Sequence, residues 1–364
     1  MPLVADGKKF ADPARRPEIK NELKALAQAA TAVANDNKAP NADPIIAFNS
    51  MTFANEARQA YASFEQNDLQ WARFSLARTS SYCIGCHTRA DRGVKDFPMS
   101  WNAEFNLLTP AQSVEFLLAN RRYKSAVEQA KRLAADQTAA SKDPRGWILP
   151  IEKTLAMIVR VNKDTLQAEE LVKLVASNKS APAYLRRDAA AWKSDIREWR
   201  EDERTGRAGR GLKLAIRLVE RAQNSGPRNS AALIRYLRAS GILAEEMEKT
   251  QSSRYAETLL YAGMVADALR DLNMGALDQF YYESCINHVP HSEMAEQCFS
   301  LLEASVRDAN PFIEIDPDSE LAVAARLDEY RRLAQVKDLI EDPRWLRRSW
   351  DENYSGSERG SSGR

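Results

Sequence analysis

The sequence has few of the residues that end a helix, and it contains no long hydrophobic run. Its 364 residues include only 14 glycines and 15 prolines. β-Branched residues rarely alternate with polar ones, so the composition favours helices over strands. No apolar stretch approaches the roughly 18 to 20 residues that cross a bilayer. We therefore expect an α-helical protein with no transmembrane segment.

An excess of one charge is also absent. The chain carries 52 Lys and Arg against 51 Asp and Glu, a formal net charge of +1. Binding of nucleic acid by bulk electrostatics needs a basic excess or stripe, so we expect no nucleic-acid partner. Hydrophobic residues make up 44% of the chain, which is enough to bury a core. The length is typical of two domains or one long repetitive array.

Apolar residues recur three and four positions apart along most of the chain, which is the spacing of amphipathic helices. Residues 17–36 are predicted to form such a helix, and the breaker-rich stretch 35–44 follows it. Helices over 49–66 and 69–87 are joined by the short turn Asn67-Asp68. These two helices should pack as an antiparallel hairpin.

From Thr109 onward, predicted helix pairs follow one another with short connections. Residues 114–130 and 256–281 resemble tetratricopeptide helix pairs, although neither matches that repeat fully and no exact period is visible. An irregular α-solenoid is the resulting prediction. A charged, glycine-rich segment, 201–211, interrupts the helices. Its glycines follow no strand, so we do not interpret it as a phosphate-binding loop.

Cysteine and histidine are scarce, with four and three residues, yet three of them fall in the pentapeptide Cys83-Ile84-Gly85-Cys86-His87. C-x-x-C-H is the attachment signature of c-type haem. On a helix, residues three and four apart share a face, so both sulfurs and the imidazole can face one macrocycle. The segment resembles a c-type cytochrome. That resemblance implies one haem c, thioether bonds from Cys83 and Cys86 to its vinyl groups, and His87 as the proximal iron ligand.

A zinc or dithiol site is the alternative interpretation of this motif. A zinc site needs about four ligands. The other candidates lie about 200 residues further along the chain: Cys285, His288, His291 and Cys298. A thioredoxin-like redox motif needs a βαβ context, which the sequence does not offer. Covalent haem is therefore the favoured hypothesis.

The sixth iron ligand decides the function, because iron held by His and Met is typical of electron transfer and an open position permits gas or peroxide binding. At about 1.5 Å per residue, Met51 and His87 fall at the same end of the predicted hairpin. Met51 is therefore the first candidate. The arrangement resembles the four-helix cytochromes of the c-prime type, in which the first helix supplies the residue opposite the proximal histidine. This resemblance covers only about residues 45–92.

Met99, in the loop 97–99, is the runner-up ligand, and a vacant or otherwise ligated iron stays open as a third outcome. Either methionine could instead be a core residue. Further residues expected near the haem edge are Phe53, Tyr82, Arg89 and Phe97. Arg89 could pair with a propionate, and the alternative is a solvated arginine.

Cys285 and Cys298 lie on either side of the turn 287–291. Antiparallel helices would bring them within disulfide range, and two buried thiols are the alternative. Disulfides and covalent haem attachment both belong to an oxidising compartment. Residues 1–9 lack the apolar core of a signal peptide. We therefore interpret the sequence as a mature or trimmed chain whose leader has been removed, and expect a periplasmic or otherwise exported protein.

The predicted organisation is all-α, with a small haem-binding module followed by an irregular tetratricopeptide-like solenoid of antiparallel helix pairs. The expected parts are an N-terminal helix and linker (1–44), a c-type haem-binding hairpin module (45–106), the helical-repeat domain (107–310), a C-terminal helical segment (311–350) and a disordered tail (351–364).

These features predict a periplasmic monohaem cytochrome that transfers single electrons and docks a protein redox partner on its helical repeats. The partner rests on an analogy between fold and function. The alternative is a haem-based gas or redox sensor, or a scaffold protein, with a vacant or displaceable sixth iron position. An electron carrier is expected rather than an enzyme. We rank peroxidase chemistry below both, because no distal His-Arg pair and no second C-x-x-C-H occurs.

Overall fold

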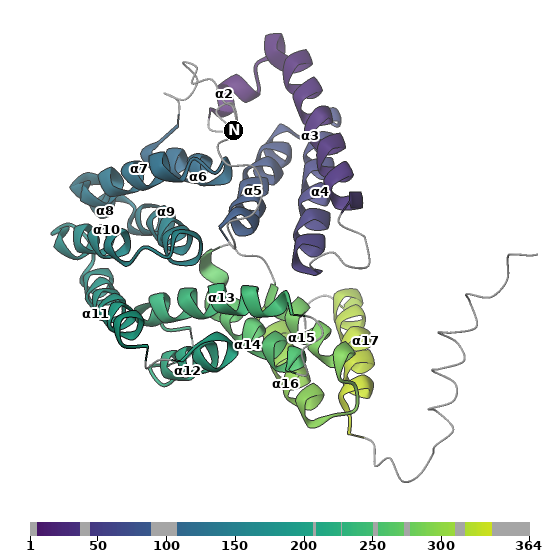
Figure 1. The fold of residues 1–364 in the computed structure, drawn as a ribbon. Helices are drawn as coiled ribbons and strands as arrows, with labels where there is room; N and C mark the ends of the chain where they lie inside the picture. Colours follow the sequence, from purple (N-terminus) through teal and green to yellow (C-terminus); the bar gives the residue numbers. More distant parts are fainter. Residues whose placement is uncertain are drawn as a thin grey trace, which may run out of the picture. The chain divides into compact units, whose positions relative to one another are not determined.

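The computed structural model describes residues 6–36, 44–88, 108–206, 209–226, 228–249, 254–272, 277–309 and 317–336. Every element in these ranges is a helix, which confirms the all-α prediction (Figure 1). None of these helices combines the length and apolar character needed to cross a membrane. The chain divides into two compact units, Met1–Tyr281 and Tyr282–Arg364, which are described separately.

The first unit begins with a helical bundle made of α2 (Gly7–Phe10), η1 (Pro13–Arg15), α3 (Arg16–Asp36), α4 (Pro44–Glu65) and α5 (Leu69–His87). Helix α4 packs against both α3 and α5. The turn between α4 and α5 is closed by Asn67, which adopts a left-handed φ of 65°, and by Asp68, which accepts a hydrogen bond from the Trp71 N–H at 3.0 Å. The hairpin therefore forms where the sequence predicts it.

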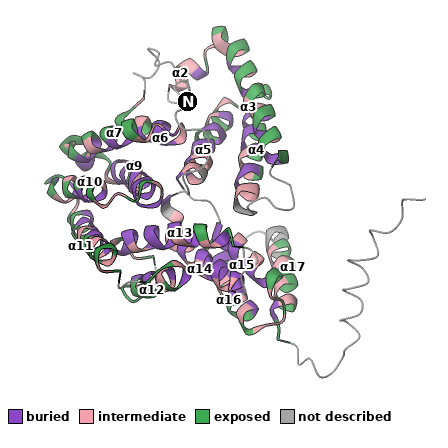
Figure 2. Ribbon diagram, in the orientation of Figure 1, coloured by how far each residue is buried: buried purple, intermediate pink, exposed green. Residues whose placement is uncertain are grey.

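Two buried clusters join the helices of this bundle, one of mainly large side chains around Phe64 and one of alanines from α3 and α4. Figure 2 shows buried residues on α3, α4 and α5. On α5, the predicted apolar stripe is buried, since Ala72 is 0%, Leu76 9% and Thr79 5% exposed. The alanine cluster therefore joins α3 to α4, while Phe64 of α4 and Leu76 of α5 share the other cluster.

Helix pairs continue the first unit. They comprise α6 (Pro110–Ala119), α7 (Tyr123–Ala135), α8 (Gln137–Lys142), α9 (Pro144–Met157), the π-helical turn η3 (Ile158–Asn162), α10 (Thr165–Ser177), α11 (Ala183–Thr205), α12 (Gly211–Gln223), η4 (Ser230–Ala232), α13 (Leu233–Met247), α14 (Tyr255–Ala268), η5 (Arg270–Leu272) and α15 (Leu277–His288), the last of which crosses into the second unit. Neighbouring helices pack in antiparallel pairs, as a solenoid requires (Figure 1).

Local capping sets where several of these helices begin. Thr109 and Gln112 form a reciprocal capping box at the start of α6. Two buried tryptophans then link helices that are next but one along the chain, α9 to α7 and α11 to η4, through their indole N–H groups. Trp147 donates to the Leu133 carbonyl, and Trp192 donates to the Ser230 carbonyl, each at 2.7 Å. Buried indoles therefore hold the repeat pairs in register.

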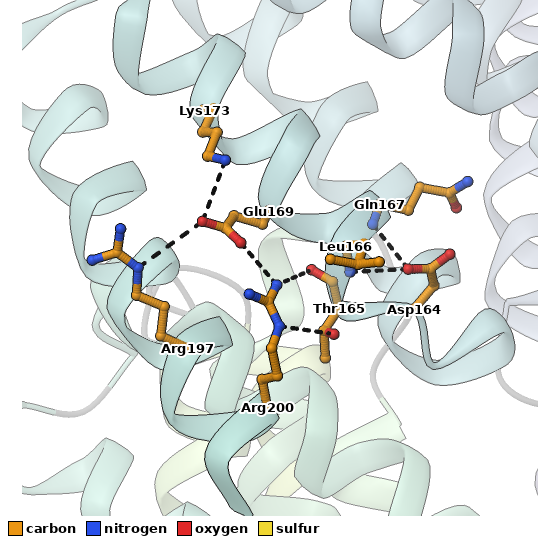
Figure 3. A network of polar contacts seen from close by, with 8 residues as sticks. All are labelled: Asp164, Thr165, Leu166, Gln167, Glu169, Lys173, Arg197 and Arg200. Carbon is orange, nitrogen blue, oxygen red and sulfur yellow. Dashed lines mark hydrogen bonds and ion pairs between the residues drawn. The ribbon is translucent and has the colours of Figure 1, made fainter. Parts of the chain in front are cut away.

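Glu169 on α10 links this helix to α11 (Figure 3). Its carboxylate lies 2.8 Å from Arg200, 3.5 Å from Lys173 and 4.0 Å from Arg197. The hydrogen bond from Arg200 holds the pKa of Glu169 below its usual value. Arg200 also reaches the hydroxyl of Thr165 at 3.5 Å, so one guanidinium fixes both the first turn and the middle of α10.

The glycine-rich segment 201–211 is not irregular throughout. Helix α11 continues through Thr205, where Gly206 adopts a left-handed φ of 63° and ends it. Arg204 pairs with Glu201 one turn earlier at 2.6 Å. Helical charge pairs therefore extend α11 into a stretch whose composition suggests a break.

The second unit contains the end of α15, α16 (Glu293–Ala309) and α17 (Pro317–Ala334). Cys285 and Cys298 form the predicted disulfide, with their Cα atoms 6.3 Å apart, and both are fully buried. His291, in the turn between α15 and α16, donates its backbone N–H to the Leu333 carbonyl at 2.8 Å. The disulfide joins α15 to α16, and this turn is fixed to the end of α17.

Asp195 on α11 supports a prediction about pH. It is 4% exposed and contacts Arg235 at 2.6 Å, while its Oδ2 has no hydrogen-bond partner among the described residues. Burial raises the pKa of Asp195 from 3.8 to about 6. The folded state therefore holds this proton more tightly than the unfolded chain, and the resulting stabilisation is lost as the pH rises from about 4 to about 6.

Asp195→Asn removes this titration and keeps the shape of the side chain. At about 1.4 kcal/mol per pKa unit, and with the unfolded carboxyl already partly ionised at pH 4, the variant should gain about 2.5 kcal/mol relative to the wild type between pH 4 and pH 7. Urea denaturation of both proteins at the two pH values measures this difference. A stability difference that does not change with pH would contradict the prediction.

Candidate functional site

The C-x-x-C-H motif forms the last turn of α5, so all five of its residues belong to one helix. Cys83 is half-buried and follows directly from the buried stripe that faces α4. Cys86 belongs to the same turn, but its side chain lies outside the described residues. Thr88 closes the helix end by donating its hydroxyl to the Ile84 carbonyl at 2.8 Å. The predicted helical presentation of the motif is therefore present.

The imidazole of His87 is oriented by the first helix pair of the solenoid. Its Nδ1 lies 2.7 Å from the carbonyl oxygen of Ala119, the last residue of α6. A carbonyl only accepts hydrogen bonds, so Nδ1 carries the proton and the lone pair resides on Nε2. Burial lowers the pKa of His87 and the charge of Arg121 adds to this, while the hydrogen bond to the Ala119 carbonyl opposes it. The lowered pKa favours the neutral imidazole, the form that binds metals.

The backbone of His87 is also held by the α6–α7 helix pair. The hydroxyl of Tyr123, the first residue of α7, donates to the His87 carbonyl at 2.6 Å. Between Ala119 and Tyr123 the chain turns through Arg121, which has a left-handed φ of 58° and is 4% exposed. The Arg121 guanidinium lies 5.7 Å from the centre of the Tyr123 ring. One tight turn thus fixes both the ring and the backbone of His87.

Gly85, the third residue of the motif, faces residues from later helices of the first unit. It lines a small cavity of about 50 Å³ together with Asn49 of α4, Arg160 of η3, Met247 of α13 and Tyr281 of α15. Ligand sites usually measure about 300 to 1,000 Å³, so this cavity does not hold a macrocycle. The donor atoms on α5 are suited to a haem. C-type attachment needs cysteine sulfurs and a histidine whose other ring nitrogen is hydrogen-bonded. His87 and the half-buried Cys83, four residues earlier, meet this need.

The remaining predicted site residues are placed as follows. Met51 lies in the second turn of α4, and its side chain is 47% exposed. Tyr82 is half-buried, with its hydroxyl 3.5 Å from Arg78, which in turn pairs with Glu56 of α4 at 3.0 Å. Arg89, Phe97 and Met99 lie outside the described residues. Within the described ranges, no cluster of three or more His, Cys, Asp or Glu side chains forms a metal site.

Sequence reasoning did not find Ala119 and Tyr123. Both lie more than thirty positions from His87, and the tetratricopeptide-like pattern of residues 114–130 does not indicate a contact with the haem motif. The nearest local clue is the Arg121-Arg122 pair in the turn between α6 and α7, which the helix pattern leaves as an ordinary connection. Comparison with protein-family models, with curated proteins and with solved structures finds no match to this chain.

Proposed function

We propose that this chain is a monohaem c-type cytochrome that carries one covalent haem c and transfers single electrons. The observation that carries the proposal is the placement of His87, whose Nδ1 donates a hydrogen bond to the Ala119 carbonyl at the end of a C-x-x-C-H helix. Metal-ligating histidines use this second hydrogen bond to fix their tautomer and to raise their basicity.

The roles of the residues follow from this assignment. Cys83 and Cys86 would hold the haem through thioethers, and Nε2 of His87 would ligate the iron. The haem supplies an iron that cycles between the ferrous and ferric states. Ala119 orients the imidazole, while Tyr123 fixes the end of α5 on which it sits. The protein therefore holds the ligand in place before the metal binds, which favours rigid, reversible electron transfer.

The sixth ligand is proposed to be Met51, with Met99 as the second candidate. The alternative function is a haem-based gas or redox sensor, in which a vacant or displaceable sixth position binds a small ligand. A Met51→Ala variant separates the two functions, because the reduced low-spin spectrum depends on Met51 only if it ligates the iron.

Export and partner docking are part of the same proposal. The buried Cys285–Cys298 disulfide is typical of an oxidising compartment, which supports a periplasmic or otherwise exported protein. Helical repeats bind proteins on extended surfaces, and we assign the docking of a protein redox partner to them.

The first experiment is a visible spectrum of the oxidised and reduced protein, produced in an exporting host that matures c-type haem. The proposal expects a Soret band that survives acid–acetone extraction, together with sharp low-spin bands on reduction. High-spin bands that shift with carbon monoxide would favour the sensor. A colourless protein would overturn the haem assignment.

Tyr123→Phe tests the support of the proximal ligand. It keeps the ring beneath Arg121 and removes only the hydroxyl that binds the His87 carbonyl. Loss of one such hydrogen bond should lower the free energy of unfolding by about 1 kcal/mol and leave the haem attached, with an increased high-spin fraction. Urea denaturation and the absorption spectrum measure the two effects. Tyr184→Phe, on an exposed ring, is the matched control and should change neither.

A further inference from the structure

A second pocket, of about 330 Å³, lies within the helical repeats of the first unit and includes no residue of the haem motif. Its walls come from the π-helical turn η3 and from α11, α12 and α13, and Gly206 and Gly209 of the segment 201–211 form one edge. The volume falls at the lower end of the range for small-molecule sites. The haem proposal does not use this pocket.

Two buried arginines form its floor. Arg160 is 6% exposed, and its Nε donates to the Ser240 hydroxyl at 2.5 Å. Arg238 is 7% exposed, contacts Asp202 at 3.1 Å and lies 5.2 Å from the centre of the Trp199 ring. Arg160 occupies the π-helical turn, a distortion that often marks functional sites. Burying a guanidinium costs free energy unless anionic partners compensate it.

The charges of the pocket do not balance. Its lining carries four cations, Arg160, Lys163, Arg210 and Arg238, against the carboxylates of Asp202 and Glu203. Lys163 pairs with Glu245, which lies outside the lining. Arg238 already contacts Asp202. Glu203 accepts a hydrogen bond from the Trp199 indole at 2.7 Å. Arg210, at the start of α12, has no hydrogen bond or ion pair with the described residues. With Glu245 counted, four cations stand against three carboxylates, and this excess of one positive charge favours an anion.

The remaining walls are apolar. Trp199 is 5% and Val159 3% exposed, and Leu214 and Ile242 complete this side. Burial also lowers the pKa of Arg238, an effect that a nearby negative charge would oppose. An inorganic anion would leave the apolar side unused, whereas an organic anion with a compact apolar body would contact both surfaces.

We propose that this pocket binds a small organic anion, with its anionic oxygens toward Arg160, Arg210 and Arg238 and its apolar or aromatic body against Trp199. Guanidinium groups bind carboxylates and phosphates through paired N–H donors, so the anionic group is either of these. The site needs no haem, so its occupancy is independent of the proposed electron transfer.

Isothermal titration of the full chain with benzoate tests this proposal, with inorganic phosphate and benzylamine as the comparison ligands. Benzoate should bind saturably with a dissociation constant of about 1 mM or lower. Phosphate should bind at least about tenfold more weakly, and benzylamine should not bind. Saturable binding of benzylamine, or phosphate binding as tight as that of benzoate, would overturn the assignment of an organic anion.

Arg210→Gln should weaken benzoate binding about tenfold, because it removes an exposed guanidinium from the lining. Lys213→Gln is the matched control, since Lys213 is an exposed cation on the same helix outside the pocket. Circular dichroism checks that both variants are folded. No saturable binding of benzoate at about 10 mM, or equal affinities of the two variants for benzoate, would overturn the proposal. The visible spectrum reports the haem separately, so either proposal can fail without the other.

Discussion

His87→Ala is expected to abolish the low-spin spectrum of the protein completely. Under the haem proposal, Nε2 of His87 is the proximal ligand, and its orientation depends on the 2.7 Å contact between Nδ1 and the Ala119 carbonyl. Alanine removes the ligand and that contact together. The two thioethers should still hold the macrocycle, so the variant should stay coloured but become high-spin. Absorption spectra of the reduced and oxidised variant measure this change.

The cysteine variants give the complementary result. Cys83→Ala and Cys86→Ala should each prevent normal covalent attachment, because each removes one thioether. Mass spectrometry of the denatured chain measures how much haem stays bound. His288→Ala is the matched control, because His288 ends α15 in the second unit. This variant should change neither the absorption spectrum nor the amount of bound haem. A native low-spin spectrum in the His87 variant, together with normal covalent attachment in the Cys83 and Cys86 variants, would show that the site is assigned wrongly.

Removing the disulfide should produce the largest loss of stability. The Cys285–Cys298 bridge has a sequence separation of 13 and joins two fully buried residues. A cross-link that closes a loop of this length stabilises a fold by about 3 kcal/mol, largely by restricting the unfolded chain. Cys285→Ala combined with Cys298→Ala should therefore lower the free energy of unfolding of the second unit by about that amount. Urea denaturation followed by far-ultraviolet circular dichroism measures it.

Two controls separate the effect of the cross-link on stability from the effect of removing two buried sulfur atoms. Dithiothreitol should destabilise the wild type by a similar amount and leave the double variant unchanged. The spectrum of the fully reduced haem should be the same in all samples under native conditions, because the haem motif belongs to the first unit. Equal unfolding midpoints for wild type and double variant under oxidising conditions would contradict the prediction.

Helices and local pairs were predictable because their causes lie within a few residues. The period of apolar side chains fixes the buried stripe of Ala72, Leu76 and Thr79, and the Asn67-Asp68 turn fixes the hairpin. Cys285 and Cys298 are separated by a short turn, so helix geometry alone brought them into range. The prediction failed at 201–205, where ion pairing carries α11 past the residues that looked like a break.

Contacts between distant segments were not predictable in the same way. Ala119 and Tyr123 hold His87 from more than thirty positions away, through a carbonyl and a hydroxyl that carry no pattern of their own. Asp195 looks like an ordinary surface carboxylate in the sequence, and only the packing of α11 on α13 buries it beside Arg235. Arg160 and Arg238 likewise lie 78 positions apart and meet only in the folded repeats.

The sequence by itself determined the helices, the hairpin, the helical C-x-x-C-H turn and the cysteine pair, because hydrogen bonding and side-chain spacing along a helix are local. Only the tertiary structure decided the tautomer of His87, the pKa of Asp195 and the position of the cationic pocket. Those properties depend on which polar groups are buried next to one another. Such neighbours are set by the packing of helices that are far apart in the sequence.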